Sequence, residues 1–200
     1  LRGGNCVRLL QGDYSRETVF GRDPAAMALR WVAEGASCLH LVDLDGARDG
    51  RSVNRDAIEA VVRAVDVPCE LGGGIRDEET IGQMLKLGLS RLVIGTKALK
   101  DPAWFREMCR RFPERLAVGI DARVGRVATD GWLATSEVPA TELAREISRE
   151  PIAAIIYTDI ARDGMMAGPN FAAMDEMNRA VEVPVVASGG VTTADDVRRL

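Results

Sequence analysis

The chain has 200 residues, of which 46% are apolar and 28% are charged, and its net charge is −4. This is the composition of an ordinary globular protein, long enough for one sizeable core. The acidic balance argues against nucleic acid or an anionic membrane surface as a partner, since both attract basic surfaces. No apolar run approaches the roughly 20 residues that span a bilayer.

Short β-branched runs alternate with amphipathic patterns along the chain. The runs predict strands over residues 38–44, 67–71, 91–95, 115–121, 153–160 and 183–188. Their near-continuous apolar character is typical of parallel strands covered on both faces. Capping signals predict helices that begin at Asp23-Pro24, at Arg76 or Asp77, and at Asp101-Pro102, and two more lie within 139–150 and 192–200. This alternation predicts a parallel α/β fold.

An internal repeat favours a closed barrel over an open sheet. The segments 43–81 and 159–197 align without a gap at an offset of 116 residues, and ten of the 39 pairs are identical. One period contains four strand–helix units, so two periods predict a (β/α)8 TIM barrel made of two half-barrels. An open dinucleotide-binding sheet would need GxGxxG after its first strand, and the chain lacks it.

The strand count leaves this barrel incomplete. "LRGGN" resembles the end of strand 1, and "DVRRL" falls within helix 7. We therefore expect residues 1–200 to be a single barrel domain without its strand 1 and strand 8 regions, cut from a chain of about 250 residues.

Glycines after three predicted strands are candidates for anion binding. They are Gly73 and Gly74 in "GGGI", Gly95 with Thr96 in "IGTKAL", and Gly189 and Gly190 in "SGGV". Glycine lets backbone N–H groups approach a phosphate, and the following helix N-terminus adds a partial positive charge. The alternative is that these are only tight turns. In a barrel, strands 3–4 and 7–8 lie opposite each other, so the repeat predicts a substrate with a phosphate at each end.

Carboxylates also fall at the predicted strand ends, where barrel active sites are built. Asp121 ends an apolar strand, where desolvation could tune its pKa for proton transfer. Asp163 lies in the glycine-flanked loop "DIARDGMMAG". Asp43 and Asp159 could instead bond only the backbone N–H groups of their own loops.

Several other side chains are weaker candidates. His40, the only histidine, lies in an apolar strand and taken alone is expected to be a hydrogen-bonded core residue. Trp132 lies in an excursion after strand 115–121, where an exposed ring could stack on a heterocycle. Arg8 and Arg76 could contact phosphates.

The cysteines are widely spaced and form no CxxC pair, so no zinc site is expected. Cys38 and Cys69 lie in strand-like runs and are expected to be buried thiols. Reduced cysteines favour a cytoplasmic location.

Taken together, the motifs resemble one family along the whole chain. They are, in order, "VRLLQGDY", "HLVDLDGA", "GGGIR", "IGTKAL", "GIDAR", "DGW", "TDIARDGMMAGPN" and "ASGGV". This set resembles the isomerases of histidine biosynthesis, which convert phosphoribosylformimino aminoimidazole carboxamide ribonucleotide from aminoaldose to aminoketose. The resemblance implies an Amadori rearrangement of a bisphosphate without cofactor or metal, in a protein that is often monomeric.

The resemblance also assigns roles to residues. The proton donor is Asp121 or Asp163, and we favour Asp163 because a mobile loop can deliver an acid after closure. The base is an aspartate expected immediately before Leu1. The implied substrate contacts are Arg8, His40, Arg76, Trp132 and Thr158, and the implied phosphate contacts are Gly74, Gly95, Thr96, Gly189 and Gly190.

Three alternatives remain open at this point. The cyclase subunit of imidazole glycerol phosphate synthase shares the fold and the repeat, but it is expected to begin with a lysine-bearing "DVKDG" pattern. A dual-substrate isomerase that also serves tryptophan biosynthesis tends to have arginine where this chain has Asp130. A non-catalytic phosphate-binding barrel is the third alternative.

Overall fold

The computed structural model describes residues 1–129, 132 and 134–200, which divide into two compact units. The first unit consists of residues 1–8 and 17–94, and the second of residues 9–16 and 95–200. Strands β1 (Cys6–Leu10) and β2 (Asp13–Gly21) form a hairpin. The tip of this hairpin therefore belongs to the second unit and its base to the first.

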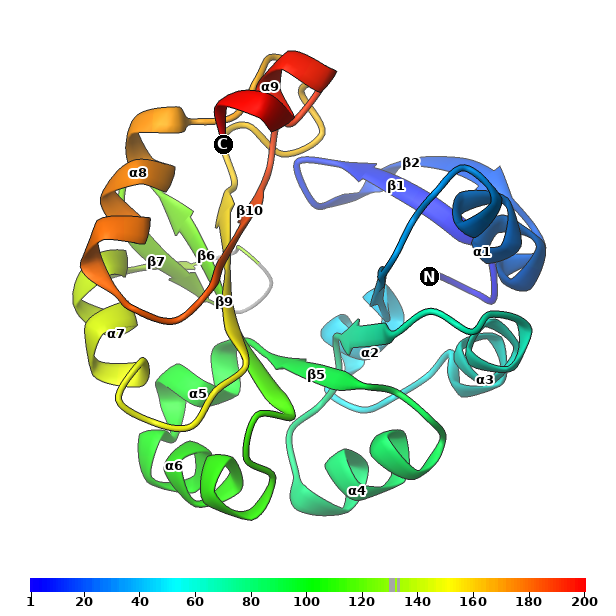
Figure 1. Ribbon diagram of the computed structural model, residues 1–200, viewed down its shortest axis with the longest axis horizontal. Helices are drawn as coiled ribbons and strands as arrows, with labels where there is room; N and C mark the ends of the chain where they lie inside the picture. Colours follow the sequence, from blue (N-terminus) through cyan, green and yellow to red (C-terminus); the bar gives the residue numbers. More distant parts are fainter. Residues whose placement is uncertain (130–131, 133) are drawn as a thin grey trace. The chain divides into compact units, whose positions relative to one another are not determined.

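The first unit, coloured from blue to green in Figure 1, is built on parallel strands. Strand β4 (Cys69–Gly72) lies between β3 (Leu39–Val42) and β5 (Arg91–Ile94). The helices of this unit are α1 (Pro24–Ala33), α2 (Leu44–Asp49), α3 (Arg55–Ala64) and α4 (Glu78–Lys86). Every residue of β4 is buried. The core around it contains fully buried side chains, among them those of Ile58, Leu71, Ile81 and Leu92. Removing each such side chain from water stabilises the folded state by about 1.5–3 kcal/mol.

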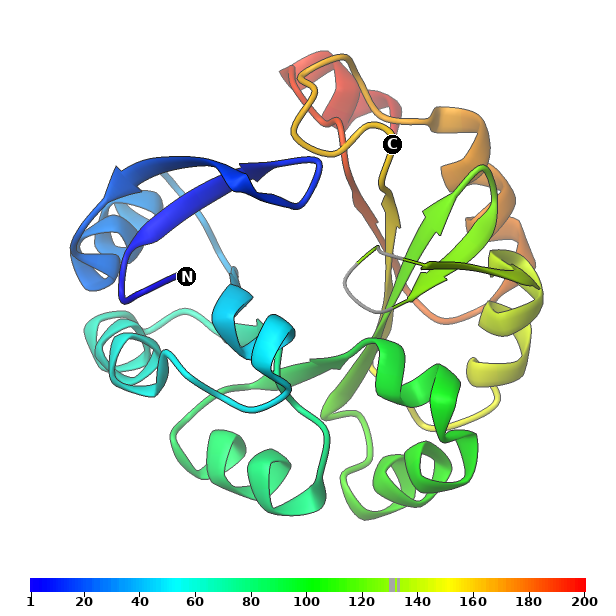
Figure 2. The same ribbon diagram turned by 180° about the vertical axis from the view of Figure 1, so that it is seen from behind.

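The second unit repeats this arrangement and adds an antiparallel extension. Strand β9 (Ala154–Asp159), buried along its whole length, lies between β6 (Leu116–Arg123) and β10 (Val185–Ser188) and runs parallel to both. Strands β7 (Arg126–Thr129) and β8 (Ala134–Pro139) continue antiparallel from β6, as Figure 2 shows. The helices of this unit are α5 (Thr96–Lys100), α6 (Pro102–Arg111), α7 (Ala140–Ile147), α8 (Phe171–Ala180) and α9 (Ala194–Arg199).

The helix-start signals in the sequence are confirmed by side-chain caps. Asp23, Asp77 and Asp101 each accept a hydrogen bond from the backbone N–H three residues on, at 3.0, 2.7 and 3.1 Å. The start near residue 76 is therefore at Asp77. Thr193 and Asp196 form a reciprocal capping box at α9.

The predicted strands are found within about two residues, with one difference that concerns the site. Strand β6 does not end at Asp121 but continues to Arg123, because Ala122 and Arg123 pair with the returning strand β7. Helices α3 and α8 were not singled out from the sequence. The prediction of a buried Cys38 is wrong, since this residue precedes β3 and is exposed, whereas Cys69 is buried.

The sequence repeat is matched by repeated local structure. Strands β4 and β10 have bounds 116 residues apart, and so do helices α3 and α8. The glycine pairs after β4 and β10 also share their backbone conformation, with φ of 96° and 76° at Gly73 and Gly74 and 91° and 84° at Gly189 and Gly190. Each unit therefore carries the same strand–turn–helix ending.

Within the residues described, no helix combines the length and apolar character needed to cross a membrane.

Candidate active site

The aspartate that follows β3 is a structural residue. Asp43 is completely buried, and its carboxylate accepts hydrogen bonds from the backbone N–H groups of Gly46, Val53 and Asn54 at 2.8, 2.8 and 3.1 Å. The side-chain amide of Asn54 adds a fourth bond at 2.7 Å. With its oxygens occupied in this way, Asp43 holds the loop that connects α2 to α3.

The second unit contains the equivalent pair. Asp159 accepts hydrogen bonds from the backbone N–H of Ala161 at 3.0 Å and from the side-chain amide of Asn170 at 2.7 Å. Asp159 and Asn170 lie 116 residues after Asp43 and Asn54. The loop-bonding alternative for both aspartates is therefore confirmed.

The strand-end glycines pack tightly against these aspartates. A Cβ atom on Gly73 would lie 2.2 Å from the Asp43 carbonyl oxygen, and one on Gly189 would lie 2.6 Å from that of Asp159. Both glycines also have positive φ, which other residues rarely adopt. The turn itself thus requires glycine, whether or not an anion binds there.

Gly95 and Thr96 have a different environment. Gly95 precedes the first residue of α5, is exposed, and a Cβ atom there would meet nothing within 4 Å. Its φ of −96° is combined with a ψ of −120°, a region that residues with a side chain rarely adopt, so the backbone conformation itself favours glycine here. The open surroundings leave this glycine accessible.

Asp121 is the carboxylate with the clearest chemical environment (Figure 1 shows its strand, β6, beside β9). It lies opposite Thr158 of β9 in the parallel pairing. The indole N–H of Trp132 donates to its Oδ2 at 2.8 Å, and the Thr158 hydroxyl also bonds the carboxyl group. Burial raises the pKa of Asp121, and the two hydrogen bonds offset only part of that shift. A carboxyl group that retains its proton more readily than usual suits acid–base chemistry.

Trp132 is held from three sides within the second unit. Besides the bond to Asp121, its backbone carbonyl accepts a hydrogen bond from the Arg123 guanidinium at 3.5 Å. Its ring lies on the tip of the β1–β2 hairpin, where a Cβ atom on Gly12 would be 2.6 Å from Cε3. The ring is half-buried rather than exposed, because it covers the carboxyl group.

Asp163 lies on the turn that follows β9, at the same edge as Asp121. Its backbone N–H bonds the carbonyl oxygen of Asp159 at 3.1 Å. The next residue, Gly164, adopts φ of 71°, and a Cβ atom there would be 3.2 Å from the Leu9 carbonyl oxygen. The turn thus places Asp163 beside the hairpin tip that also supports Trp132.

His40 is not a core residue, so that prediction is wrong, although its hydrogen-bonding expectation is met. Its side chain is 42% exposed, and its Nδ1 lies 2.7 Å from Glu70 Oε1. Glu70 also binds Arg91, and the three residues form a row across β3, β4 and β5. Burial alone would raise the pKa of Glu70, but the bonds from His40 and Arg91 outweigh it and lower that pKa. The row lies two to three residues before the ends of these strands.

The two candidate arginines of the first unit also have local contacts. The guanidinium of Arg8 stacks on the Phe20 ring at 5.3 Å from its centroid. Arg76 donates to the Ala47 carbonyl oxygen at 3.3 Å and lies over Gly50, at the end of α2. Both arginines are exposed, so their charged groups remain accessible.

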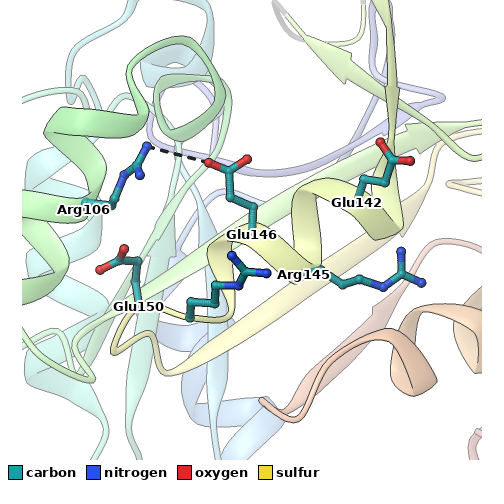
Figure 3. A pocket seen from close by; sticks show the side chains of 6 residues that line it. Arg106, Glu142, Arg145, Glu146 and Glu150 are labelled. Carbon is teal, nitrogen blue, oxygen red and sulfur yellow. Dashed lines mark ion pairs between the residues drawn. The ribbon is translucent and has the colours of Figure 1, made fainter.

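A separate pocket of about 430 Å³ lies on the outer helices of the second unit (Figure 3). Its walls carry as many arginines as glutamates, namely Arg106, Glu142, Arg145, Glu146, Arg149 and Glu150. Arg106 and Glu146 approach to 3.7 Å, with both side chains more than 40% exposed. Charges that neutralise one another in solvent contribute little, so this pocket is a solvated surface, and none of the candidate site residues lines it. The described residues also contain no group of three or more His, Cys, Asp or Glu that could hold a metal ion.

The sequence of the chain matches a known protein family. The sequence model of the family described as "Histidine biosynthesis protein" matches residues 1–200. The chain belongs to this family.

Curated members of the histidine biosynthesis protein family are similar along nearly the whole chain. A relative from Rhodopirellula baltica is 57% identical over 203 residues, covering 100% of this chain and 80% of its own length. A relative from Cereibacter sphaeroides is 54% identical, and the match covers 100% of this chain and 84% of the relative. A relative from Crocosphaera subtropica is 52% identical, and the match covers 97% of this chain and 76% of the relative. All three are named 1-(5-phosphoribosyl)-5-((5-phosphoribosylamino)methylideneamino) imidazole-4-carboxamide isomerase.

The structure brings together some of the candidates and adds residues that sequence reasoning missed. Asp121, Trp132 and Thr158 are in contact, and Asp163 lies at the same edge of the second unit. Asn54 and Asn170 were missed, although they form one of the identical pairs of the repeat. Gly12 was missed because only its contact with a residue 120 positions away reveals its role. Asp130, which bears on dual specificity, lies outside the described residues.

Proposed function

We propose that this protein is an isomerase of histidine biosynthesis that converts phosphoribosylformimino aminoimidazole carboxamide ribonucleotide from its aminoaldose to its aminoketose form. The observation that carries the proposal is 57% identity, over the whole chain, to a relative named for this activity. Asp121 is half-buried, its pKa is raised by desolvation, and it contributes a carboxyl group to the proposed site.

The rearrangement proceeds by proton transfers between the substrate and acidic and basic groups of the protein. An acid protonates the ribose ring oxygen, and the ring opens to an imine. A base removes the C2′ proton, and the enolamine tautomerises to the ketone. Asp163 is the proposed donor, because its turn follows β9 at the edge where Asp121 lies. Asp121 orients the substrate, and Thr158 and Trp132 hold its carboxyl group in place.

The substrate carries two phosphates, and each unit offers a glycine turn for one of them. Gly73 and Gly74 are the proposed contacts in the first unit, and Gly189 and Gly190 in the second. Gly95 and Thr96 are further proposed phosphate contacts, and a Cβ atom on Gly95 would meet nothing within 4 Å. Arg8, His40 and Arg76 are proposed substrate contacts.

The finer structural proposals follow from the family and the repeat. The parallel strands and the 116-residue repeat support a (β/α)8 barrel of two half-barrels, folded as one domain over residues 1–200. The protein is proposed to act as a monomer in the cytoplasm, on a small bisphosphate and without a cofactor.

The test compares turnover in the full natural chain with that of its Asp163→Asn and Asp121→Asn variants. Loss of a general acid lowers kcat by typically 10²–10⁴ while the substrate still binds. We expect this loss for Asp163→Asn, with a smaller loss for Asp121→Asn. The reverse order would assign the acid to Asp121. Ammonia-dependent closure of an imidazole ring from the aminoketose, without isomerisation, would refute the proposed function and indicate the cyclase.

A further inference from the structure

Two hairpin turns of the second unit share one unusual backbone conformation. Gln11 and Gly12 join β1 to β2 with φ of 50° and 73°, and Val124 and Gly125 join β6 to β7 with φ of 51° and 72°. Two positive φ values in a two-residue loop are the pattern of hairpin turns that match the twist of the strands. By backbone conformation alone, the two glycines are interchangeable.

Their surroundings differ completely. A Cβ atom on Gly125 would meet nothing within 4 Å. A Cβ atom on Gly12 would lie 2.6, 2.9 and 3.4 Å from Cε3, Cζ3 and Cδ2 of Trp132. Hairpin geometry therefore explains both glycines, but only at Gly12 does the absence of a side chain also make room for an aromatic ring.

The ring above Gly12 cannot move freely. Its indole N–H is bonded to Asp121 at 2.8 Å, and its backbone carbonyl is bonded to Arg123. Carbon atoms pack at about 3.5–4.0 Å, so an added methyl group would push the ring by about 1 Å. A hydrogen bond of 2.8 Å does not survive a displacement of that size, because it weakens steeply with distance and angle.

We propose that Gly12 is a positioning residue for Asp121 that acts through Trp132. Because Gly12 has no side chain, the Trp132 ring packs directly against the turn, in the position from which its indole N–H donates to the Asp121 carboxyl group. The tip of the β1–β2 hairpin thereby fixes the orientation of a carboxyl group on β6, more than 100 residues further along the chain. The kinetic part of this proposal rests on the proposed function, whereas the structural part does not.

The test compares Gly12→Ala with Gly125→Ala, because both variants carry the same backbone strain and only the first adds a contact. The first measurement is the indole N–H resonance of Trp132, identified by its loss in Trp132→Phe. The second is the titration of the Asp121 carboxyl carbon, which moves to higher pH when the indole bond is lost, since that bond lowers its pKa. None of these substitutions changes Thr158, whose hydroxyl also bonds the Asp121 carboxyl group in the structure.

We expect Gly12→Ala to shift both signals and to lower kcat by about 10- to 100-fold with a smaller change in KM, as a misplacement of about 1 Å commonly does. Gly125→Ala should leave the signals and turnover at wild-type values. In a Trp132→Phe background, Gly12→Ala should shift the Asp121 titration no further, because the bond is already absent.

Equal behaviour of the two alanine variants would overturn the proposal, and so would lost turnover with an unchanged indole signal. If Gly12→Ala does not fold, Gly12→Asn replaces it, because asparagine tolerates positive φ but still has a Cβ atom. A wild-type protein without isomerase activity, in which Gly12→Ala still shifts both signals, would refute the proposed function and leave the positioning role intact.

Discussion

Replacing Asn54 by alanine should destabilise the protein more than replacing its repeat partner Asn170. The side-chain amide of Asn54 donates to Asp43 at 2.7 Å and to Asp45 at 3.0 Å, and both carboxylates are buried. The amide of Asn170 donates to one carboxylate, Asp159, at 2.7 Å. The two positions are therefore equivalent in the repeat but unequal in the number of charged groups they satisfy.

The expected magnitudes follow from these bonds. A hydrogen bond to a charged group contributes about 1.5–3 kcal/mol, so loss of two at Asn54 should cost roughly 3–6 kcal/mol. Asn170→Ala loses one such bond and a 3.3 Å cap to the Ala173 N–H, which should together cost about 2–5 kcal/mol, with the Asn54→Ala cost the larger of the two. The free energy of unfolding is measured by urea denaturation, with equal m-values required for the comparison.

The matched control is Asn178→Ala, which changes an exposed asparagine of α8 and should stay within about 0.5 kcal/mol of wild type. A cost below about 1 kcal/mol for Asn54→Ala, or one smaller than that of Asn170→Ala, would refute the bond-based reasoning. In either case the buried carboxylates would have to be satisfied in some other way.

Three further predictions concern ionisable groups. Because the pKa of Asp121 is raised in the folded state above its ordinary value of 3.8, ionisation of this carboxyl group opposes folding above that pH. The melting temperature of Asp121→Asn should therefore rise relative to that of the wild type as the pH increases from about 4 to about 7. An unchanged difference in melting temperature over this range would contradict the prediction. The pKa of Glu70 is lowered, so Glu70→Gln should cost about 1–2 kcal/mol at pH 7. That cost should shrink as pH falls below 4.5, which urea titrations at several pH values can follow. Burial raises the pKa of the Cys109 thiol to about 12, whereas Cys38 is exposed. A thiol reagent at about pH 8 should therefore label Cys38 before Cys109 in the native protein, as peptide mass spectrometry can show. Equal labelling of these two cysteines would be inconsistent with the burial of Cys109.

Local signals in the sequence predicted much of the fold. Apolar runs located the parallel strands, and aspartate–proline pairs located the starts of α1 and α6, because both signals depend on neighbouring residues. The repeat also contains information about hydrogen bonds. Its identical Asp43–Asn54 and Asp159–Asn170 pairs correspond to the same hydrogen bond in each unit.

The contacts of the site depend on distant residues and could not be predicted in this way. That Trp132 bonds Asp121 depends on how the β7–β8 extension returns along β6, and apolar patterning does not encode that path. The pairing of His40 with Glu70 depends on the register of two strands 30 residues apart, and the same registry leaves His40 partly exposed. Periodicity assigns a residue to a strand but not the neighbour it meets there.

The most direct test of the account is the conversion of the aminoaldose substrate by the full natural chain, in which the remaining aminoaldose and the aminoketose product are separated and measured over time. The account predicts steady formation of the aminoketose with no added metal or cofactor, and its loss in Asp163→Asn. Unchanged aminoaldose in the presence of folded wild-type protein would contradict it.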